Sequence, residues 1–314
     1  YRTRRSSDGQ QRRRLVRAQA TRQLGRNISI ARAGLAEPKK PCGVFLLTGP
    51  SGTGKTETAL ALAGELYGGE QHLITLNMSE YQEAHSISGL KGSPPGYVGY
   101  GEGGILTEAV RRRPYSVVLL DEIEKAHPDI HELFFQVFDK GRMEDGEGRQ
   151  IDFRNTLILL TSNIGSDLLR QTTEEAESAL LAGQLHTELL NYFPAAFLGR
   201  VCVIPYLPLP VGILTDIVRS QMDKISVRLF QQHNIRMKYS ELLLTYIINL
   251  SRTASSGARG IIHVIERKVL PVIAGYILSP SSPEVPAVEG VIVSYSENNG
   301  VIVTPDGSSL KSIN

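Results

Sequence analysis

The stretch CGVFLLTGPSGTGKTETALALAGELYGG (42–69) places an apolar run, a glycine-rich turn and a helical pattern next to one another. The run 42–49 is short, apolar and closed by Gly, which is typical of a strand buried on both faces of a parallel sheet. Residues 55–69 follow at helical spacing and stop at a pair of glycines, where helices commonly end. This order predicts the first strand and the first helix of an α/β domain.

Similar units follow along the chain. Four further runs have the length and apolar character of buried strands: 72–77, 116–122, 155–163 and 200–206. Helical patterns lie between them at 104–114 and 129–141. Strands that alternate with helices predict a three-layer α/β domain over 34–207, with a central, mostly parallel, five-stranded sheet.

The pattern changes after LPLP (207–210). An amphipathic pattern covers 213–232, two more helices fit 240–250 and 260–278, and the last apolar runs have the pattern of a hairpin that turns at Asn298, Asn299 and Gly300. We expect a smaller, mainly helical lid domain over 208–314 that ends in this β-hairpin.

The composition, 41% apolar and 21% charged, favours a folded soluble protein. No apolar run approaches the length of a membrane span, and no signal peptide opens the chain. Cys42 and Cys202 lack metal-ligand spacing and the seven His are scattered, so we expect no metal site built from them. Thiols without a signal peptide favour the cytoplasm. Because the first residue is Tyr rather than Met, we expect a piece of a longer chain.

Residues 1–33 form a basic arm. Residues 1–32 hold ten of the 34 Lys and Arg but one of the 32 acidic residues, so the rest of the chain is net acidic. An Arg-rich arm can bind nucleic acid through its phosphates. However, QQRRRLVRAQATRQLGR (10–26) offers no aromatic side chain on which bases could stack. We therefore expect a solvated terminal helix rather than a nucleic-acid site.

The turn GPSGTGKT (49–56) matches the phosphate-binding pattern G-x-x-x-x-G-K-[ST] in the strand–loop–helix context that this pattern requires. Gly52 and Gly54 allow backbone N–H groups to point at phosphate oxygens, and the helix N-terminus adds positive potential. We expect Lys55 to reach the β- and γ-phosphates and the Thr56 hydroxyl to bind Mg²⁺. The predicted site for ATP and Mg²⁺ comprises Gly49, Pro50, Ser51, Gly52, Thr53, Gly54, Lys55 and Thr56.

Two other strand ends carry polar candidates. Asp121 lies at the end of an apolar run, where α/β sheets place their ligands, and suits the shell of Mg²⁺ through a water. Glu122 follows it and can polarise an attacking water. Asn163 ends the run 155–163, and its amide can orient water without adding charge. Three strand ends that converge on one phosphate make each of these assignments stronger than it is alone.

The segment GSPPGYVGYGEGG (92–104) has six glycines and two prolines, so it is predicted to be an exposed loop. Yet Tyr97, Val98 and Tyr100 are residue types that proteins usually bury. From the residues alone, two interpretations stay open. The rings pack into the core beneath a static loop, or the loop displays them for binding.

Several segments resemble the AAA+ ATPases, specifically the second, C-terminal module of the Clp-type unfoldases. These segments span most of 34–270 and are LKGSPPGYVGY (90–100), VRRRPYSVVLLDEIEKAHPDIHE (110–132), DKGRMEDGEGRQIDFRNTLILLTSN (139–163) and SGARG (256–260). Within this family, YGGEQHLITLNMSEYQEAHS (67–86) and AAFLGR (195–200) look most like the ClpV branch, the ATPases of type VI secretion.

The resemblance implies an ATPase that unfolds proteins as a homo-hexameric ring, in which Tyr97 and its loop meet the other subunits' loops at the axis and grip an extended polypeptide. Residues 142–150 match the second pore loop. Arg200 matches the arginine finger, which reaches the γ-phosphate of the neighbouring subunit and stabilises transition-state charge. Arg259 matches the arginine through which the small domain senses nucleotide.

The ClpV-like segments imply that the substrates are subunits of contracted type VI secretion sheaths. General disaggregation, as in ClpB, is the alternative. A Clp peptidase partner is disfavoured because 165–193 contains no apolar-Gly-apolar docking tripeptide. A module that binds ATP only to assemble a ring, or a nucleic-acid-binding switch, is an alternative of another class, and Glu122 and Arg200 argue against it.

Overall fold

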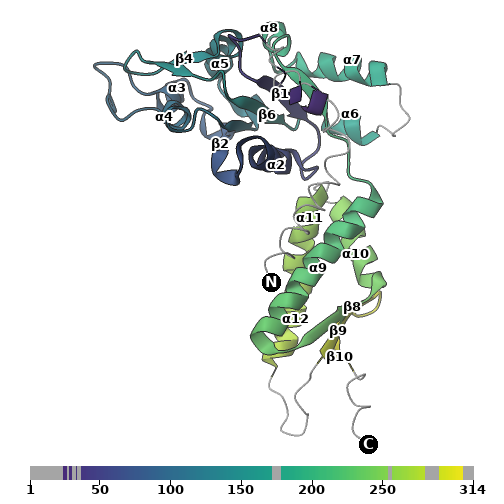
Figure 1. Ribbon diagram of the computed structural model, residues 1–314. Coiled ribbons are helices and arrows are strands. Elements are labelled where there is room, and N and C mark those ends of the chain that lie inside the picture. Colours follow the sequence, from purple (N-terminus) through teal and green to yellow (C-terminus); the bar gives the residue numbers. More distant parts are fainter. Residues whose placement is uncertain are drawn as a thin grey trace, which may run out of the picture. The chain divides into compact units, whose positions relative to one another are not determined.

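The central sheet of the large domain has five parallel strands in the order β2-β3-β6-β1-β7 (Figure 1). They are β1 (Gly43–Thr48), β2 (Leu73–Asn77), β3 (Val117–Asp121), β6 (Leu157–Ser162) and β7 (Cys202–Pro205). Each lies within one of the five apolar runs, so the predicted α/β fold is confirmed. The computed structural model describes residues 24–26, 28–29, 33, 37–171, 178–253, 257–279 and 290–306.

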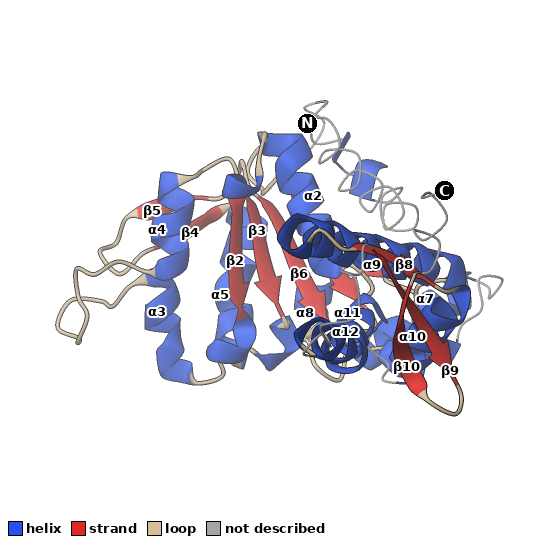
Figure 2. Cartoon of the chain, turned by 90° about the horizontal axis from the view of Figure 1, so that it is seen from below, coloured by secondary structure: helices blue, strands red, loops and turns tan. Residues whose placement is uncertain are grey.

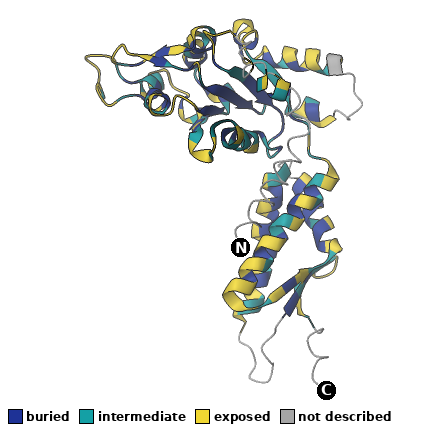
Figure 3. Cartoon of the chain, in the orientation of Figure 1, coloured by how far each residue is buried: buried dark blue, intermediate teal, exposed yellow. Residues whose placement is uncertain are grey.

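Both faces of this sheet are buried, which explains why its strands are almost wholly apolar. One face belongs to a core cluster with α5 (Pro128–Lys140), and the other to a cluster with α2 (Lys55–Tyr67). The first cluster includes Leu46, Leu120, Leu160, Phe134 and Phe138; the second includes Leu47, Leu119, Leu159, Ala59 and Ala63. Figure 3 shows buried strands between helices whose outer surfaces are exposed.

The remaining elements of the large domain are mostly short. They are α3 (Ile87–Lys91), α4 (Ile105–Arg112), β4 (Arg142–Glu144), β5 (Gln150–Asp152), α6 (Ser166–Gln171), α7 (Ser178–Leu189), α8 (Ala195–Leu198) and the 3₁₀ turns Glu70–His72, Met78–Glu80, Ala84–Ser86 and Ile123–Lys125. Strands β4 and β5 pair antiparallel as a hairpin, which the sequence analysis did not predict. With three residues each, they are too short to show a periodic pattern.

Part of the basic arm packs on the large domain. Leu24 is 2% exposed and belongs to the core cluster that contains Phe45 and Leu47, and Ile28 packs against the same cluster. The prediction of a solvated arm is therefore wrong at the carboxyl end of the arm, where these two apolar side chains are removed from water. Residues 1–23 lie outside the described residues.

The second compact unit begins at Leu209 and is mainly helical. It consists of α9 (Val211–His233), β8 (Arg236–Tyr239), α10 (Glu241–Thr253), α11 (Gly257–Val264), a π-helical turn (Ile265–Val269), α12 (Leu270–Leu278), β9 (Gly290–Ser296) and β10 (Gly300–Pro305). None of the helices that the structure describes, here or in the large domain, is long and apolar enough to cross a membrane.

Two predictions for this small domain need correction. Strands β9 and β10 form the predicted antiparallel hairpin, but β8 pairs parallel with β9, so the sheet has three strands. The strand RMKY has too few apolar residues to stand out in the sequence. The helix predicted over 260–278 contains the π-helical turn just before Pro271, because proline has no N–H to continue the regular hydrogen bonds.

We predict that Phe134→Ala destabilises the large domain by about 3–5 kcal/mol, because Phe134 is fully buried and its loss leaves a cavity. The unfolding transition of the large domain in urea measures this change. Gly183→Ala is the control, since Gly183 lies in α7 with open space around it, and it should stabilise by up to about 1 kcal/mol. Equal effects of the two substitutions would contradict the assignment of the core.

Candidate functional site

The loop between β1 and α2 is shaped by three glycines with positive φ: Gly49 (139°), Gly52 (73°) and Gly54 (99°). A Cβ on Gly49 would lie 2.3 Å from the carbonyl oxygen of Tyr206, so no larger residue fits there without displacing backbone. No side chain among the described residues caps the start of α2. Such a helix terminus attracts anions, and the narrow glycine loop lets one approach the backbone. The loop therefore fits a phosphate.

Lys55 is the side chain that joins this loop to the neighbouring strand. It is only 8% exposed, and its Nζ donates to the carbonyl oxygens of Gly49 and Pro50 (3.0 Å to Pro50) and to Oδ1 of Asn163 (3.2 Å). Thr53 Oγ1 donates to the same Pro50 oxygen at 2.9 Å. The structure thus brings two predicted residues, Lys55 and Asn163, into direct contact across the ends of β1 and β6.

The side chain of Thr161, which the sequence analysis missed, forms hydrogen bonds with both Asp121 and Glu122. The hydroxyl of Thr161 on β6 donates to Oδ1 of Asp121 and accepts from the backbone N–H of Glu122 at 3.1 Å. Glu122 has φ 57° and ψ 49°, a left-handed conformation that costs a residue other than glycine about 1–3 kcal/mol. Thr161 stabilises this turn, and its place beside Asp121 follows from the parallel pairing of β3 and β6.

Two charged residues after β3 complete this edge of the sheet. Lys125 Nζ lies 2.7 Å from Oε2 of Glu122, and this hydrogen bond raises the pKa of the Lys125 ammonium group. Glu124 Oε1 accepts from the backbone N–H of Asn163 at 3.0 Å. The other oxygen of Glu124 is buried and has no hydrogen-bond partner in the described part of the chain. The sequence alone does not single out Lys125 or Glu124, since both lie in an ordinary turn.

The polar groups at the carboxyl ends of these strands are suited to Mg²⁺ only when a bound phosphate supplies further ligands. The Thr56 hydroxyl and the Asp121 carboxylate are the hard oxygen donors that Mg²⁺ prefers. In the described residues, however, no three His, Cys, Asp or Glu side chains are grouped so that they could hold a metal by themselves. A magnesium ion here would take its other ligands from phosphate oxygens and water, as is usual for this metal.

Tyr206 connects β7 to the phosphate loop. Its backbone N–H donates to Thr48 at 2.8 Å, and its hydroxyl lies 2.7 Å from Oγ1 of Thr58 on α2. Burial raises the pKa of Tyr206 to about 12, so the phenol stays neutral at physiological pH. Together with its carbonyl contact at Gly49, this residue fixes the loop from the edge of the sheet, a role that the sequence analysis missed.

Arg200 lies at the opposite edge of the sheet from the phosphate loop. It precedes β7 by two residues, and β7 runs parallel to β1 with Cys202 opposite Phe45, so Arg200 is near the amino ends of the strands. Its Nε donates to Oδ2 of Asp139 at 2.9 Å and its Nη1 to the carbonyl oxygen of Ala196 at 2.7 Å. The guanidinium carbon also lies 5.4 Å from the centre of the Phe135 ring. Arg200 therefore does not face the phosphate loop of its own chain.

The loop 92–104 displays its large side chains. Tyr97 is 71% exposed, Val98 99% and Tyr100 52%, so these residues do not pack into the core beneath the loop. Figures 1 and 2 show the loop extending past α3 and α4, beside the turn between β4 and β5. Arg259 is also exposed, in α11 of the small domain. Its predicted role in sensing nucleotide stays a prediction.

Comparisons with known proteins agree with this architecture. Residues 40–204 match the family of the AAA domain (Cdc48 subfamily), and residues 209–289 match the C-terminal, D2-small domain of ClpB protein. The chain is similar, at 30% identity and a TM-score of 0.75, to a closed-state cryo-EM structure of Hsp104 with ATPγS and FITC-casein. That alignment covers 90% of this chain and 48% of the Hsp104 chain.

Two curated relatives belong to different branches of the Clp proteins. The chain is 61% identical over 260 residues to chaperone protein ClpB of Yersinia enterocolitica, which covers 82% of this chain and 29% of the relative. It is 50% identical over 283 residues to AAA+ ATPase ClpV1 of Pseudomonas aeruginosa, which covers 89% of this chain and 31% of the relative. The chain thus spans about 30% of the length of these relatives.

Identity is higher to the ClpB relative than to ClpV1, so the resemblance to the ClpV branch is not confirmed at that level. The matches agree that the chain is a Clp-type ATPase module, since they cover a nucleotide-binding domain followed by the small domain of a second Clp module. The chain belongs to the AAA+ ATPase family, as a Clp-type second ATPase module with its large and small domains.

Proposed function

We propose that this chain is the second ATPase module of a hexameric, cytoplasmic protein-remodelling motor, which threads polypeptide through a central pore. The observation that carries the proposal is the contact of Lys55 with Asn163 beside Asp121 and Glu122, in a domain that also displays an aromatic loop. The first feature suits phosphoryl transfer and the second suits a grip on varied side chains.

In this proposal, residues 49–56 hold ATP. Lys55 exchanges its contacts with neutral oxygens for the β- and γ-phosphates, which are stronger acceptors because they are charged. The Thr56 hydroxyl and, through water, Asp121 hold Mg²⁺. A bound Mg²⁺ would neutralise phosphate charge and so favour attack on the γ-phosphate.

Glu122 is the proposed base. Its left-handed backbone and the Thr161 hydroxyl hold it at the end of β3, next to the strand that carries Asn163. Glu122 would accept the proton of the attacking water while Asn163 orients that water. The ion pair with Lys125 is largely exposed, so it is a weak restraint that Glu122 can leave during the reaction.

Arg200 is proposed to act on the neighbouring subunit of a homo-hexamer. Its position at the far edge of the sheet removes it from its own phosphate loop, which is what an arginine finger supplied in trans requires. Asp139 and Phe135 hold the guanidinium in place, and Arg200 lowers the pKa of Asp139 through their hydrogen bond. A positioned cation of this kind loses little freedom when it meets a phosphate.

For the substrate, we propose subunits of contracted type VI secretion sheaths, with Tyr97, Val98 and Tyr100 as the gripping residues. The similarity to ClpV1 and the ClpV-like segments support this choice. A general disaggregase is the second candidate, supported by the higher identity to the Yersinia ClpB and by the casein-bound Hsp104 structure. Both candidates use the same loop, so the loop does not discriminate between them.

We predict that Lys55→Ala weakens ATP binding by about 100-fold, since it removes charge-assisted contacts with the phosphates. Titration of the full-length protein with a fluorescent ATP analogue measures the dissociation constant. Lys40→Ala is the control, because Lys40 is exposed and its ion pair with Glu37 lies on the surface. An unchanged affinity in Lys55→Ala would place the nucleotide elsewhere.

Glu122→Gln should lower the rate of ATP hydrolysis by about 100-fold or more and leave ATP binding intact, because the amide keeps the shape but cannot accept the proton. Single-turnover hydrolysis and nucleotide affinity of the full-length protein are the two measurements. Glu132→Gln, an exposed position on α5, should hydrolyse ATP normally. Hydrolysis that survives Glu122→Gln would refute the assignment of the base.

The substrate proposal predicts that contracted sheath subunits stimulate the ATPase rate of the full-length protein several-fold, whereas an unfolded model protein stimulates it little. Tyr97→Ala should abolish the stimulation, because the ring supplies most of the contact area with the polypeptide. Tyr192→Ala, which removes another exposed tyrosine, should not. Stimulation by the unfolded protein and none by sheath would instead support the general disaggregase.

A further inference from the structure

The exposed loop 92–104 and the turn between β4 and β5 share one base. The backbone N–H of Gly146 donates to the carbonyl oxygen of Lys91, at the end of α3, at 2.9 Å. A Cβ on Gly146 would lie 2.5 Å from the carbonyl oxygen of Ser93, and one on Gly104 would lie 2.2 Å from that of Leu90. The hairpin turn therefore touches the start of the loop backbone to backbone at Gly146, and the end of the loop touches α3 at Gly104, both approaches that glycine permits.

Asp145 organises the turn of the hairpin. Its side chain is 3% exposed, and Oδ1 accepts from the backbone N–H groups of Glu147 (2.9 Å) and Arg149 (2.8 Å). Oδ2 accepts from Nε of Arg149 at 2.7 Å. Burial alone would raise the pKa of Asp145, but the hydrogen bonds from Arg149 and Glu147 lower it below its ordinary value. The carboxylate is thus charged at neutral pH and holds the turn rigid.

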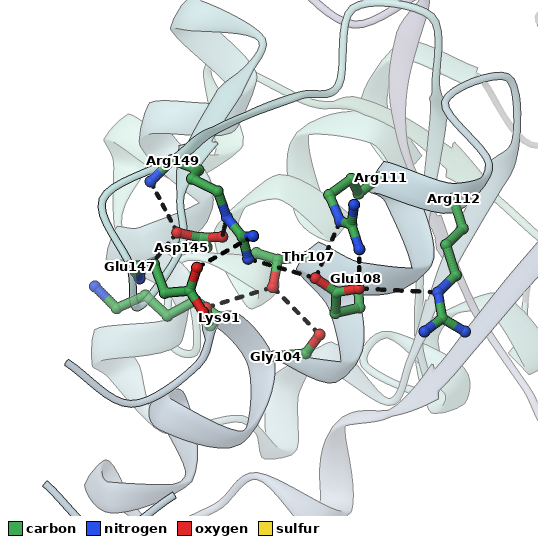
Figure 4. Close-up of polar contacts among 9 residues, drawn as sticks. All are labelled: Lys91, Gly104, Thr107, Glu108, Arg111, Arg112, Asp145, Glu147 and Arg149. Atoms are coloured by element: carbon green, nitrogen blue, oxygen red, sulfur yellow. Dashed lines mark hydrogen bonds and ion pairs between the residues drawn. The ribbon is translucent and has the colours of Figure 1, made fainter. Parts of the chain in front are cut away.

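Arg149 extends this network to the helix that follows the loop. Its Nη2 lies 3.6 Å from Oε1 of Glu108 on α4, and Glu108 in turn binds Arg111 at 2.7 Å (Figure 4). Thr107 on the same helix donates to the carbonyl oxygens of Gly104 (3.2 Å) and Lys91 (3.4 Å). Charges of alternating sign therefore connect the hairpin turn to α4, and the Thr107 hydroxyl joins that helix to the residues at both ends of the loop.

The hairpin is also joined to the nucleotide edge. The 3₁₀ turn after Glu122 is followed two residues later by α5, which ends at Lys140 and is capped by Gly141, and β4 begins at the residue after Gly141. Phe153, after β5, donates back to Gly141 at 2.8 Å. A rigid helix thus lies between the proposed base and the hairpin, whereas the aromatic loop is attached to α3 and α4.

We propose that the loop 92–104 and the hairpin turn 145–149 move as one body, with Asp145 and Arg149 as positioning residues for Tyr97. This inference rests on the proposed function of the loop. The hairpin carries the position of α5 to the loop through the Gly146 backbone contact and the Arg149–Glu108 pair, so that a shift at the nucleotide edge displaces the aromatic side chains without bending their loop.

Hydrogen exchange of the full-length, ATP-bound protein tests the coupling. In Arg149→Gln, amides of 92–104 should exchange about threefold faster, an effect of the size expected for an ion pair of this exposure. In Asp145→Asn, the increase should reach about tenfold, since a buried charged hydrogen bond is weakened. Arg149→Lys, which keeps the charge, should restore part of the protection. The KM for the sheath subunits that stimulate the ATPase should rise several-fold with little change in kcat.

Arg154→Gln is the matched control, because Arg154 pairs with Asp152 near the same hairpin and, among the described residues, its side chain makes no hydrogen bond or ion pair with the loop or α4. It should leave the exchange of 92–104 and the KM unchanged, and peptides of β1 and β6 report any general loosening. Unchanged exchange of 92–104 in both Arg149→Gln and Asp145→Asn would overturn the coupling. If exchange rises but Tyr97→Ala leaves KM unchanged, the coupling stands and the proposed function of the loop fails.

Discussion

Burial on both faces of the parallel sheet is the constraint on which the rest of the large domain depends. Alternate residues of β1, β3 and β6 enter two different cores, one against α2 and one against α5. A slip of one residue between strands would send each leucine to the wrong face, so the register is strongly determined. The same register sets Thr161 beside Asp121 and brings the ends of β1 and β6 together. The geometry of the candidate site is thus a consequence of apolar packing.

The site itself is built from conformations that an isolated peptide would avoid. Gly49 lies against the carbonyl of Tyr206, and Glu122 occupies a left-handed conformation. These local costs are small beside the free energy gained by burying the sheet, to which each fully buried side chain contributes about 1.5–3 kcal/mol. A rigid apolar scaffold can therefore hold a strained polar edge, as pre-organised sites generally require.

The aromatic loop shows the opposite balance. Its tip leaves Tyr97 and Val98 in water, where burial contributes nothing to stability, while its base is fastened by backbone contacts and by Arg149. A loop of glycines without such a base would lose the orientation of its rings to conformational entropy. Exposure of the rings and rigidity of the base are therefore complementary features of one structure.

The sequence by itself determined the strands of the central sheet, the phosphate loop and the polar residues that end β3 and β6, because each has a local pattern along the chain. Only the tertiary structure decided which side chains meet. Thr161, Lys125, Tyr206 and the Asp145–Arg149–Glu108 network have no local signature, and neither do β8 and the burial of Leu24. The physical reason is that periodicity records which face of an element is buried, whereas a hydrogen bond between residues distant in sequence depends on how whole elements pack.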